Sequence, residues 1–317
     1  MTDSAIPHPA GSVAAVIVAY FPGPDLTALI ADLRPQVQRL FVIDNSGPDR
    51  IDGIPGPPAG LVVHNPRNLG IAAALNQGLH LARAAGCRWL LTLDQDVSAG
   101  PDLVARLVQT AENHPQAERL AMVAANLGDA ELGIRARFLR RRFGPLFERA
   151  SCRGDRLDDV ALAVSAGSLY RVDVMEKLGG FREDYFIDYV DTEYCLRALE
   201  AGYRIAVACH ARLNHRLGDR RRARLAGLDF FPTHHPPVRW YYIARNRVPT
   251  VRAYARRFPF WFTYDLAASA YGLMRMLLFE GDRRRKLQAV WLGTRDGLRG
   301  RMGEAPPDPA LAEARPR

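Results

Sequence analysis

The chain has 317 residues, of which 48% are hydrophobic, and it carries a formal net charge of +9. This length and composition are ordinary for a globular protein with one large domain, or one and a half, and a sizeable core. The four cysteines have no short paired spacing, which excludes a zinc cluster of the Cys-x-x-Cys type.

The cysteines also bear on the compartment. Cys87, Cys152, Cys195 and Cys209 are expected to be reduced and structural, as in an intracellular protein. Residues 1–11 contain neither a basic start nor a long apolar run, so no signal peptide is expected. Together these features predict a protein that stays inside the cell.

The positive charge is concentrated in the C-terminal part. Between His210 and Arg301 there are 20 Lys and Arg residues against 6 Asp and Glu, so the remainder is net negative. Nearly all the basic residues are arginine, whose guanidinium fork suits phosphates and anionic head groups. This part could face nucleic acid, anionic lipid or a phosphorylated substrate.

Strand and helix patterns alternate in the first third of the chain. Short apolar runs predict buried strands at Val13–Ala19, Leu40–Ile43, Leu61–Val63 and Leu90–Leu93. Helical spacing follows three of them, and each strand ends in a polar loop. This order predicts an α/β fold with an open, mainly parallel sheet and a ligand crevice at the carboxyl ends of the strands.

Polar side chains follow the predicted strands at that edge. Tyr20, Asp44, Asn68 and the pair Asp94 and Asp96 would gather along one rim. On its own, the stretch around Asp44 or Asn68 is better explained as turn chemistry. The agreement of four separate loops is what favours a site.

The acidic pair Asp94 and Asp96 comes directly after a buried strand. Along an extended chain their side chains would point to one side, with Gln95 on the other. Two neighbouring carboxylates repel each other, so a divalent cation between them is the natural neutraliser. A solvated, Asp-rich turn is the alternative.

The middle of the chain is predicted less regularly. Residues 129–154 carry arginines and little periodicity, and we expect a long loop over the site. Val160–Tyr170 is expected to be one strand, with Gly167 allowing a close approach. Asp191 would stand at a helix N-terminus, where capping is the structural alternative to catalysis. His215 stands alone, and a lone histidine is more often a surface or packed residue than a ligand.

The C-terminal part mixes aromatic and basic residues. The apolar segment Leu266–Phe279 is interrupted by Arg275 and is too polar and short for a membrane span. Helices lying in a membrane interface are favoured slightly over helices packed on the core. The expected domains are a disordered tail (1–12), a catalytic domain (13–216), a basic helical region facing the acceptor or membrane (217–301) and a disordered tail (302–317).

The ordered set of motifs resembles the family 2 glycosyltransferases with the GT-A fold, over about residues 13–216. The branch that it resembles most is that of the bacterial rhamnosyltransferases. The motifs are Val16–Tyr20, Val42–Ser46, Asn68–Gly70, Leu93–Asp96, Gly179–Phe181, Phe186–Asp191 and Glu193.

The resemblance implies a nucleotide-sugar pocket. Asp44 would contact the nucleotide base, with Tyr20, Asn68 and Gly70 lining the same pocket and Asp94 beside the diphosphate.

It also implies a metal site and a base. Asp94 and Asp96 would hold Mg²⁺ or Mn²⁺ against the donor diphosphate, and His215 would complete the metal shell as in some members. Asp191 matches the catalytic base of an inverting transfer.

For a rhamnosyltransferase the implied donor is dTDP-L-rhamnose, and the acceptor is a surface polysaccharide or a lipid-linked saccharide at the inner face of the membrane. Transfer of another sugar, galactofuranose or a UDP-hexose, is the alternative within the family. A nucleic-acid-binding protein is the alternative outside it, although no nucleic-acid motif accompanies the arginines. No Gly-x-Gly-x-x-Gly follows the first strand and no Gly-Lys-Ser/Thr occurs, which disfavours an oxidoreductase and an NTPase.

Overall fold

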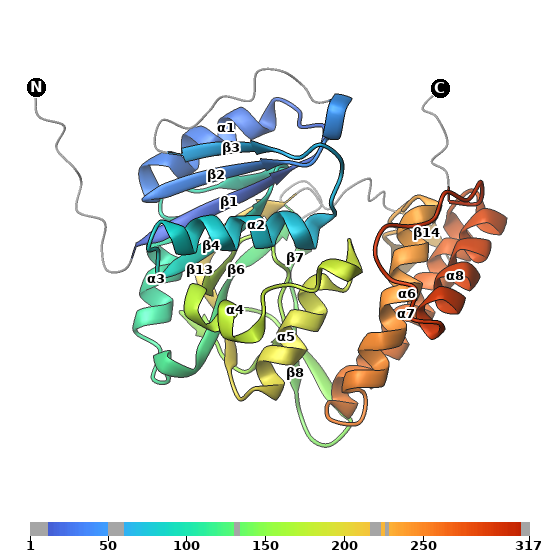
Figure 1. Ribbon diagram of the computed structural model, residues 1–317. Helices are drawn as coiled ribbons and strands as arrows, with labels where there is room; N and C mark the ends of the chain where they lie inside the picture. Colours follow the sequence, from blue (N-terminus) through green and yellow to red (C-terminus); the bar gives the residue numbers. More distant parts are fainter. Residues whose placement is uncertain (1–11, 50–59, 130–133, 216–222, 226–227, 312–317) are drawn as a thin grey trace, which may run out of the picture.

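The computed structural model describes residues 12–49, 60–129, 134–215, 223–225 and 228–311 (Figure 1). The N-terminal half contains β1 (Val13–Ala19), α1 (Asp25–Leu33), β2 (Arg39–Asp44), β3 (Gly60–His64), α2 (Ile71–Ala84), β4 (Trp89–Asp94), β5 (Val97–Ala99), α3 (Leu103–Glu112) and β6 (Leu120–Asp129). Then follow β7 (Ile134–Arg135), β8 (Phe138–Arg141), β9 (Phe147–Ala150), β10 (Arg156–Leu157), β11 (Val160–Leu162), β12 (Ser168–Arg171), α4 (Val172–Leu178), α5 (Val190–Glu200) and β13 (Arg204–His215). The C-terminal part contains β14 (Ala223–Leu225), β15 (Leu228–Phe230), α6 (Pro237–Tyr254), α7 (Pro259–Phe279) and α8 (Arg283–Leu298).

The central sheet has the order β10-β13-β6-β12-β4-β1-β2-β3. Neighbours among β1 to β4 are parallel, as are β6 and β13, whereas β12 runs antiparallel between β4 and β6. The predicted α/β fold with a mainly parallel sheet is therefore confirmed.

Both faces of this sheet are covered by helices. Side chains of α1 and α3 pack on one face, and those of α2, α4 and α5 pack on the other. Strand β1 is buried along its whole length, which is why its sequence is a continuous apolar run rather than an alternating one. Because helices cover both faces, the carboxyl ends of the parallel strands are the part of the sheet left open to a ligand.

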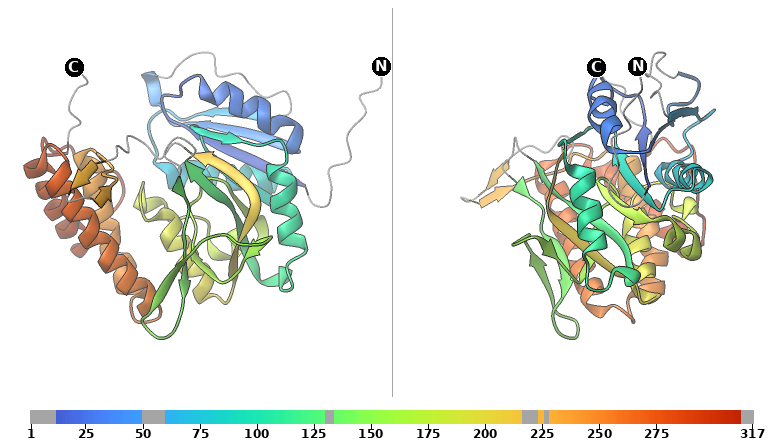
Figure 2. Two further views of the ribbon diagram at one scale, coloured as in Figure 1. Left: turned by 180° about the vertical axis from the view of Figure 1, so that it is seen from behind. Right: turned by 90° about the vertical axis from the view of Figure 1, so that its left-hand side faces the viewer.

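The C-terminal helices α6, α7 and α8 stand beside the sheet domain rather than on a face of the sheet (Figures 1 and 2). Helices α6 and α8 approach each other very closely. A Cβ atom on Gly297 would lie 2.5 Å from the carbonyl oxygen of Arg245, so only glycine fits there.

Two predictions for the middle of the chain are wrong. The expected loop 129–154 contains β7, β8 and β9, and β8 pairs with β9 and β11 in a small antiparallel sheet. The expected strand Val160–Tyr170 is two strands in different sheets, because the chain turns at residues 163–167. Short strands of a small sheet depend on partners distant in sequence, so their periodicity is weak.

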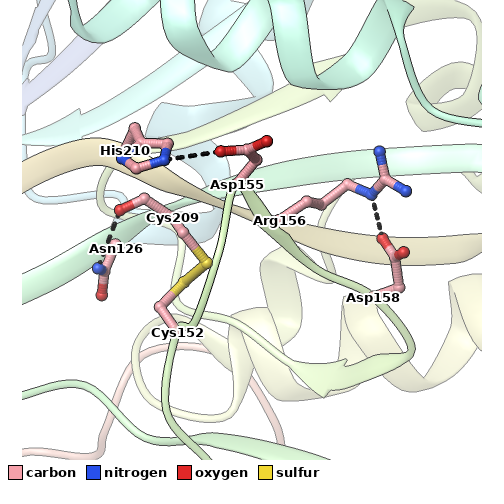
Figure 3. Close-up of a disulfide and its surroundings, with 7 residues drawn as sticks. All are labelled: Asn126, Cys152, Asp155, Arg156, Asp158, Cys209 and His210. Carbon is pink, nitrogen blue, oxygen red and sulfur yellow. Dashed lines mark hydrogen bonds and ion pairs between the residues drawn. A yellow bond between two sulfur atoms is a disulfide. The ribbon is translucent and has the colours of Figure 1, made fainter.

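The expectation of four reduced cysteines is also wrong. Cys152 and Cys209 form a disulfide across 57 residues of sequence, whereas Cys87 and Cys195 are free and buried. Figure 3 shows the bond beneath an ion pair between Asp155 and His210, whose Oδ1 and Nε2 atoms lie 2.9 Å apart. The pairing depends on tertiary contact between two distant segments. Because of this disulfide, the cysteines no longer support the prediction of a reducing, intracellular compartment.

The C-terminal tail differs from expectation over residues 302–311. Leu311 is buried, and the backbone N–H of Ala305 donates to the Tyr242 hydroxyl oxygen at 2.7 Å. The carbonyl oxygen of Gly303 accepts a hydrogen bond from the Arg245 guanidinium. This stretch therefore packs on α6. The rest of the expected tail, 312–317, and the N-terminal residues 1–11 lie outside the described residues.

Candidate active site

Strand register brings the predicted rim together. Ala19, directly before Tyr20, pairs with Asp44 on the neighbouring strand, and Val18 pairs with Asp94 on the other side. The carboxyl ends of β4, β1 and β2 therefore lie side by side. Tyr20 is half exposed at this edge.

Asp44 is a buried carboxylate with fixed partners. Its Oδ1 accepts the backbone N–H of Ser46 at 3.0 Å, and its Oδ2 lies 2.8 Å from Nδ1 of His64. Burial raises the pKa of this carboxyl, but the hydrogen bonds from Ser46 and His64 outweigh it and lower the pKa below its usual value. Asp44 is thus held ionised, and it orders the elbow after β2.

The loop with Asn68 and Gly70 contacts two other segments, the elbow after β2 and the segment before α5. The Asn68 side-chain oxygen accepts hydrogen bonds from the Asn45 side chain and the Gly70 backbone, each at 2.9 Å. The backbone of Gly70 has a φ of +85°, and a Cβ there would collide with the backbone of Phe186. The backbone N–H of Ile71 donates to the Phe186 carbonyl oxygen at 2.8 Å. The loop thus connects the sheet rim to the segment that precedes α5.

The Asp94 to Asp96 stretch is a turn rather than an extended chain. Strand β4 ends at Asp94, residues 95 and 96 turn, and β5 begins at Val97, so alternation along a strand does not fix how the two carboxylates point. Gln95 has a structural task. Its side chain accepts the Tyr20 N–H at 2.6 Å and donates to the Tyr20 carbonyl oxygen at 3.0 Å, which locks the ends of β1 and β4 together.

The backbone also brings His215 to this place. On β13, His215 pairs with Val97, the residue next to Asp96. The set of two carboxylates and one imidazole suits Mg²⁺ or Mn²⁺ chemically. The side chain of His215 lies outside the described part, and among the described side chains no three His, Cys, Asp or Glu groups cluster to hold a metal ion.

Asp191 lies in the first turn of α5, one residue after the helix starts; the N-cap residue is Tyr189, whose side chain makes no capping hydrogen bond. Its Oδ2 accepts the Ser165 backbone N–H at 3.2 Å, and the side chain forms part of the wall of a cavity. Burial raises the pKa of this carboxyl, and the nearby Asp188 carboxylate raises it further. A half-covered carboxyl with a raised pKa is suited to accept a proton at neutral pH.

An arginine that no sequence motif selects completes this region. Arg239 on α6 makes a two-pronged ion pair with Asp188, with both N···O distances at 2.7 Å. Burial lowers its pKa, but the carboxylates of Asp188, Asp191 and Asp94 outweigh burial and raise the pKa. Arg239 thus contacts Asp188 and is close enough to Asp191 and Asp94 for their charges to act on it. Nothing in the local sequence distinguishes it from the many other C-terminal arginines.

The segment before α5 has an unusual backbone. Phe186, Asp188 and Tyr189 all have positive φ angles, of 64°, 64° and 62°. Such angles are costly for residues other than glycine and persist only where the surroundings enforce them. The side-chain N–H₂ of Asn246, on α6, lies 2.8 to 2.9 Å from the carbonyl oxygens of Tyr185, Ile187 and Asp188. Helix α6 therefore fixes the segment that carries Asp188 and leads into Asp191.

This fold and site are those of an α/β domain of the kind that binds nucleotide sugars. Comparison with known sequences leads to the same class of protein. The family model described as glycosyl transferase family 2 matches residues 14–179, which is just over half of the chain. The chain belongs to glycosyl transferase family 2 and is a glycosyltransferase.

Among curated proteins, the chain is similar to dTDP-rhamnosyl transferase RfbF of Shigella flexneri. The two are 26% identical over 298 residues, which cover 92% of this chain and 97% of that protein. The expected resemblance to the rhamnosyltransferase branch is thereby confirmed.

Solved structures support the fold. The residue 1–349 fragment of S. aureus TarS, in complex with UDP-GlcNAc, has a TM-score of 0.56 and 13% identity, and the match covers 88% of this chain and 79% of that one. GalNAc-T7 with UDP, GalNAc and Mn²⁺ has a TM-score of 0.57 and 14% identity over 78% of this chain. The chain spans only 49% of the length of GalNAc-T7.

Proposed function

We propose that the protein is an inverting transferase that moves L-rhamnose from dTDP-L-rhamnose to a sugar acceptor, a surface polysaccharide or a lipid-linked saccharide. Similarity to a dTDP-rhamnosyl transferase along nearly the whole chain supports the donor. The observation that carries the mechanism is the position of Asp191 in a cavity wall, next to the ion pair between Arg239 and Asp188.

Donor binding is assigned to the sheet rim. Asp44, Tyr20, Asn68 and Gly70 would surround the nucleoside, and Asp94 would lie beside the diphosphate. Asp94 and Asp96 would hold Mg²⁺ or Mn²⁺, with His215 as a third ligand. When bound, the ion would neutralise charge on the departing diphosphate.

Asp191 is assigned as the general base. Its carboxylate would take the proton of the acceptor hydroxyl while that oxygen bonds to the anomeric carbon. The bond from this carbon to the donor phosphate breaks on the opposite face, which inverts the configuration. Arg239 would add positive charge near the diphosphate, where negative charge develops in the transition state.

Thermal shifts with dTDP, UDP and GDP, each with and without Mn²⁺, test the donor first. A ligand at 100 times its Kd adds about 2.7 kcal/mol of stability. Stabilisation by dTDP that needs metal supports the proposal, and Asp96→Ala should lose this metal-dependent stabilisation. Stabilisation by UDP instead would move the sugar to galactofuranose or a hexose. A response to none would overturn the assignment.

Contact with an anionic membrane at the inner face of the cell is part of the proposal. Helix α7 exposes Tyr271, Leu277 and Leu278, and Arg283 and Arg284 follow it on the surface. Apolar side chains beside arginines suit an anionic lipid surface. Within the described residues, no helix has the length and apolar content to cross a membrane.

Vesicle flotation tests this contact. Binding to vesicles that contain anionic lipid, and not to zwitterionic vesicles, is expected, and Leu278→Glu should weaken it. The exposed variant Gln288→Ala serves as a control because Gln288 is also exposed but polar. Equal recovery with both vesicle types, or with neither, would remove the membrane from the proposal.

A further inference from the structure

A large cavity lies between the sheet domain and the C-terminal helices. Its volume is about 930 Å³, near the upper end of the range for small-molecule sites. Asp188, Asp191 and Thr192 form part of its wall. The cavity therefore begins at the proposed base.

The wall supplied by the helices contains a stripe of aliphatic residues, beside the charged residues Arg247, Arg252, Asp265 and Arg275. Along α6 one face contributes residues at helical spacing, and α8 contributes a matching stripe. These residues are Ile243, Ala244, Val248 and Val251 on α6 and Val290, Thr294 and Leu298 on α8. Regular spacing of this kind makes a continuous apolar wall rather than isolated contacts.

The middle of α7 has too few protein partners for its composition. The buried residues of this helix are Phe260, Trp261, Asp265 and Met276, so no residue from 266 to 275 is buried. Within that stretch only Ser269, Tyr271 and Arg275 have polar side-chain atoms. Ala268, Gly272 and Leu273 line the cavity. Apolar surface left open on this scale marks a binding site.

Two hydrogen-bond donors in the cavity wall also lack acceptors in the described part of the protein. The indole Nε1 of Trp240 and the Nε of Arg275 are both covered and make no hydrogen bond there. Trp240 is only 7% exposed. A covered donor without an acceptor is costly, and because neither atom is open to the cavity, each would meet an oxygen of a bound molecule after its side chain turns.

We propose that this cavity takes the hydrocarbon chain and the linking phosphate of a lipid-linked saccharide acceptor, whose sugar hydroxyl then lies at Asp191. This inference rests on the proposed function and narrows its acceptor. The aliphatic stripe suits a hydrocarbon chain, and the polar residues of the wall lie beside the end that contains Asp191 or around the stripe. The donors of Trp240 and Arg275 suit phosphate oxygens.

Calorimetric titration with n-alkyl phosphates of increasing chain length, without nucleotide, tests the proposal. Each added methylene should tighten binding about threefold to fourfold while the chain still fits, and binding should have a negative heat-capacity change. Affinity that does not depend on chain length would overturn the proposal.

Matched variants on α7 locate the binding. A Cβ on Gly272 would lie 3.6 Å from the Trp240 ring, so the side chain of Gly272→Leu would project into the cavity. It should lose at least about tenfold in affinity for decyl phosphate, whereas Ala270→Leu, on the exposed side of the same helix, should bind as the wild type does. Ala268→Leu repeats the test if Gly272→Leu folds poorly. If Gly272→Leu and Ala268→Leu both bind decyl phosphate with wild-type affinity, the ligand does not bind in this cavity.

Trp240→Phe tests the phosphate contact. It should weaken binding of decyl phosphate and leave decanol unaffected; equal effects on both would contradict this part. These experiments can refute lipid binding in the cavity without refuting the proposed rhamnosyl transfer, and the reverse also holds. The titration needs neither donor nor turnover, and dTDP thermal shifts in Gly272→Leu report the donor site separately.

Discussion

Replacement of Asn246 by alanine should release the backbone that positions the proposed base. Asn246 is fully buried, and its amide group donates to carbonyl oxygens of the segment with positive φ angles before α5. In Asn246→Ala the carbonyl oxygens of Ile187 and Asp188 lose this donor, whereas that of Tyr185 keeps the Arg245 guanidinium at 2.9 Å. Each carbonyl left unsatisfied costs about 1–3 kcal/mol.

The strained segment should relax when these hydrogen bonds are lost, which moves its backbone and offsets part of this cost. Phe186, Asp188 and Tyr189 each hold a backbone conformation that costs about 1–3 kcal/mol. The hydrogen bonds from Asn246 enforce these conformations. Because the amide has only two hydrogens, we count two lost hydrogen bonds, or about 2–6 kcal/mol of stability. The melting temperature should fall by roughly 4–12 °C, allowing about 2 °C per kcal/mol for a chain of this size.

Catalysis should suffer as well, because Asp191 follows this segment directly. A misplacement of about 1 Å can cost on the order of 100-fold in rate. Thermal melts and initial rates of dTDP release measure the two effects, with Gln288→Ala as an exposed control. If Asn246→Ala has the melting temperature and the initial rate of the wild type, the hydrogen bonds from Asn246 do not hold this segment in place.

Three further expectations concern single groups. The pKa of Asp191 is raised in the folded state, so the folded protein keeps this proton to higher pH than the unfolded chain and loses stability as pH rises through that range. Asp191→Asn should therefore melt higher than the wild type at pH 7 but not in acid, and transfer about 10² to 10⁴ times more slowly; a lower melting temperature at pH 7 would contradict this. Arg239→Lys keeps the charge but loses the two-pronged contact with Asp188, so kcat/KM measured by dTDP release should fall at least about tenfold; an unchanged value would exclude a role. Replacing Cys152 and Cys209 by serine opens a loop of 57 residues and should cost about 4 kcal/mol in urea melts, and equal midpoints would show that the bond adds nothing.

Local patterns in the sequence were sufficient for the sheet and its rim. Buried parallel strands have continuous apolar runs, and each is followed by a polar loop, so β1, β2 and β4 could be recognised one at a time. Parallel strands place their carboxyl ends at one edge, so the chain order alone is enough to predict that Asp44 and Asp94 lie together. The register of the strands agrees with this expectation.

The small sheet and the disulfide had no such local signal. Strand β8 pairs with β11, which follows it only after β9 and β10, and Cys152 meets Cys209 only after β13 has joined the sheet. Pairing over such distances depends on the folded surroundings and not on the composition of either segment. For the same reason the tail residue Leu311, in a polar stretch, was not expected to be buried.

The sequence by itself determined the class of fold, the family and the acidic residues of the candidate site, because each of these is written in a short stretch of chain. Only the tertiary structure decided how α6 takes part. It brings Arg239 to Asp188 and Asn246 to the strained backbone, and it forms one wall of the cavity beside Asp191. These contacts join residues more than fifty positions apart. An arginine or asparagine on a helix has no local pattern that reveals a distant partner.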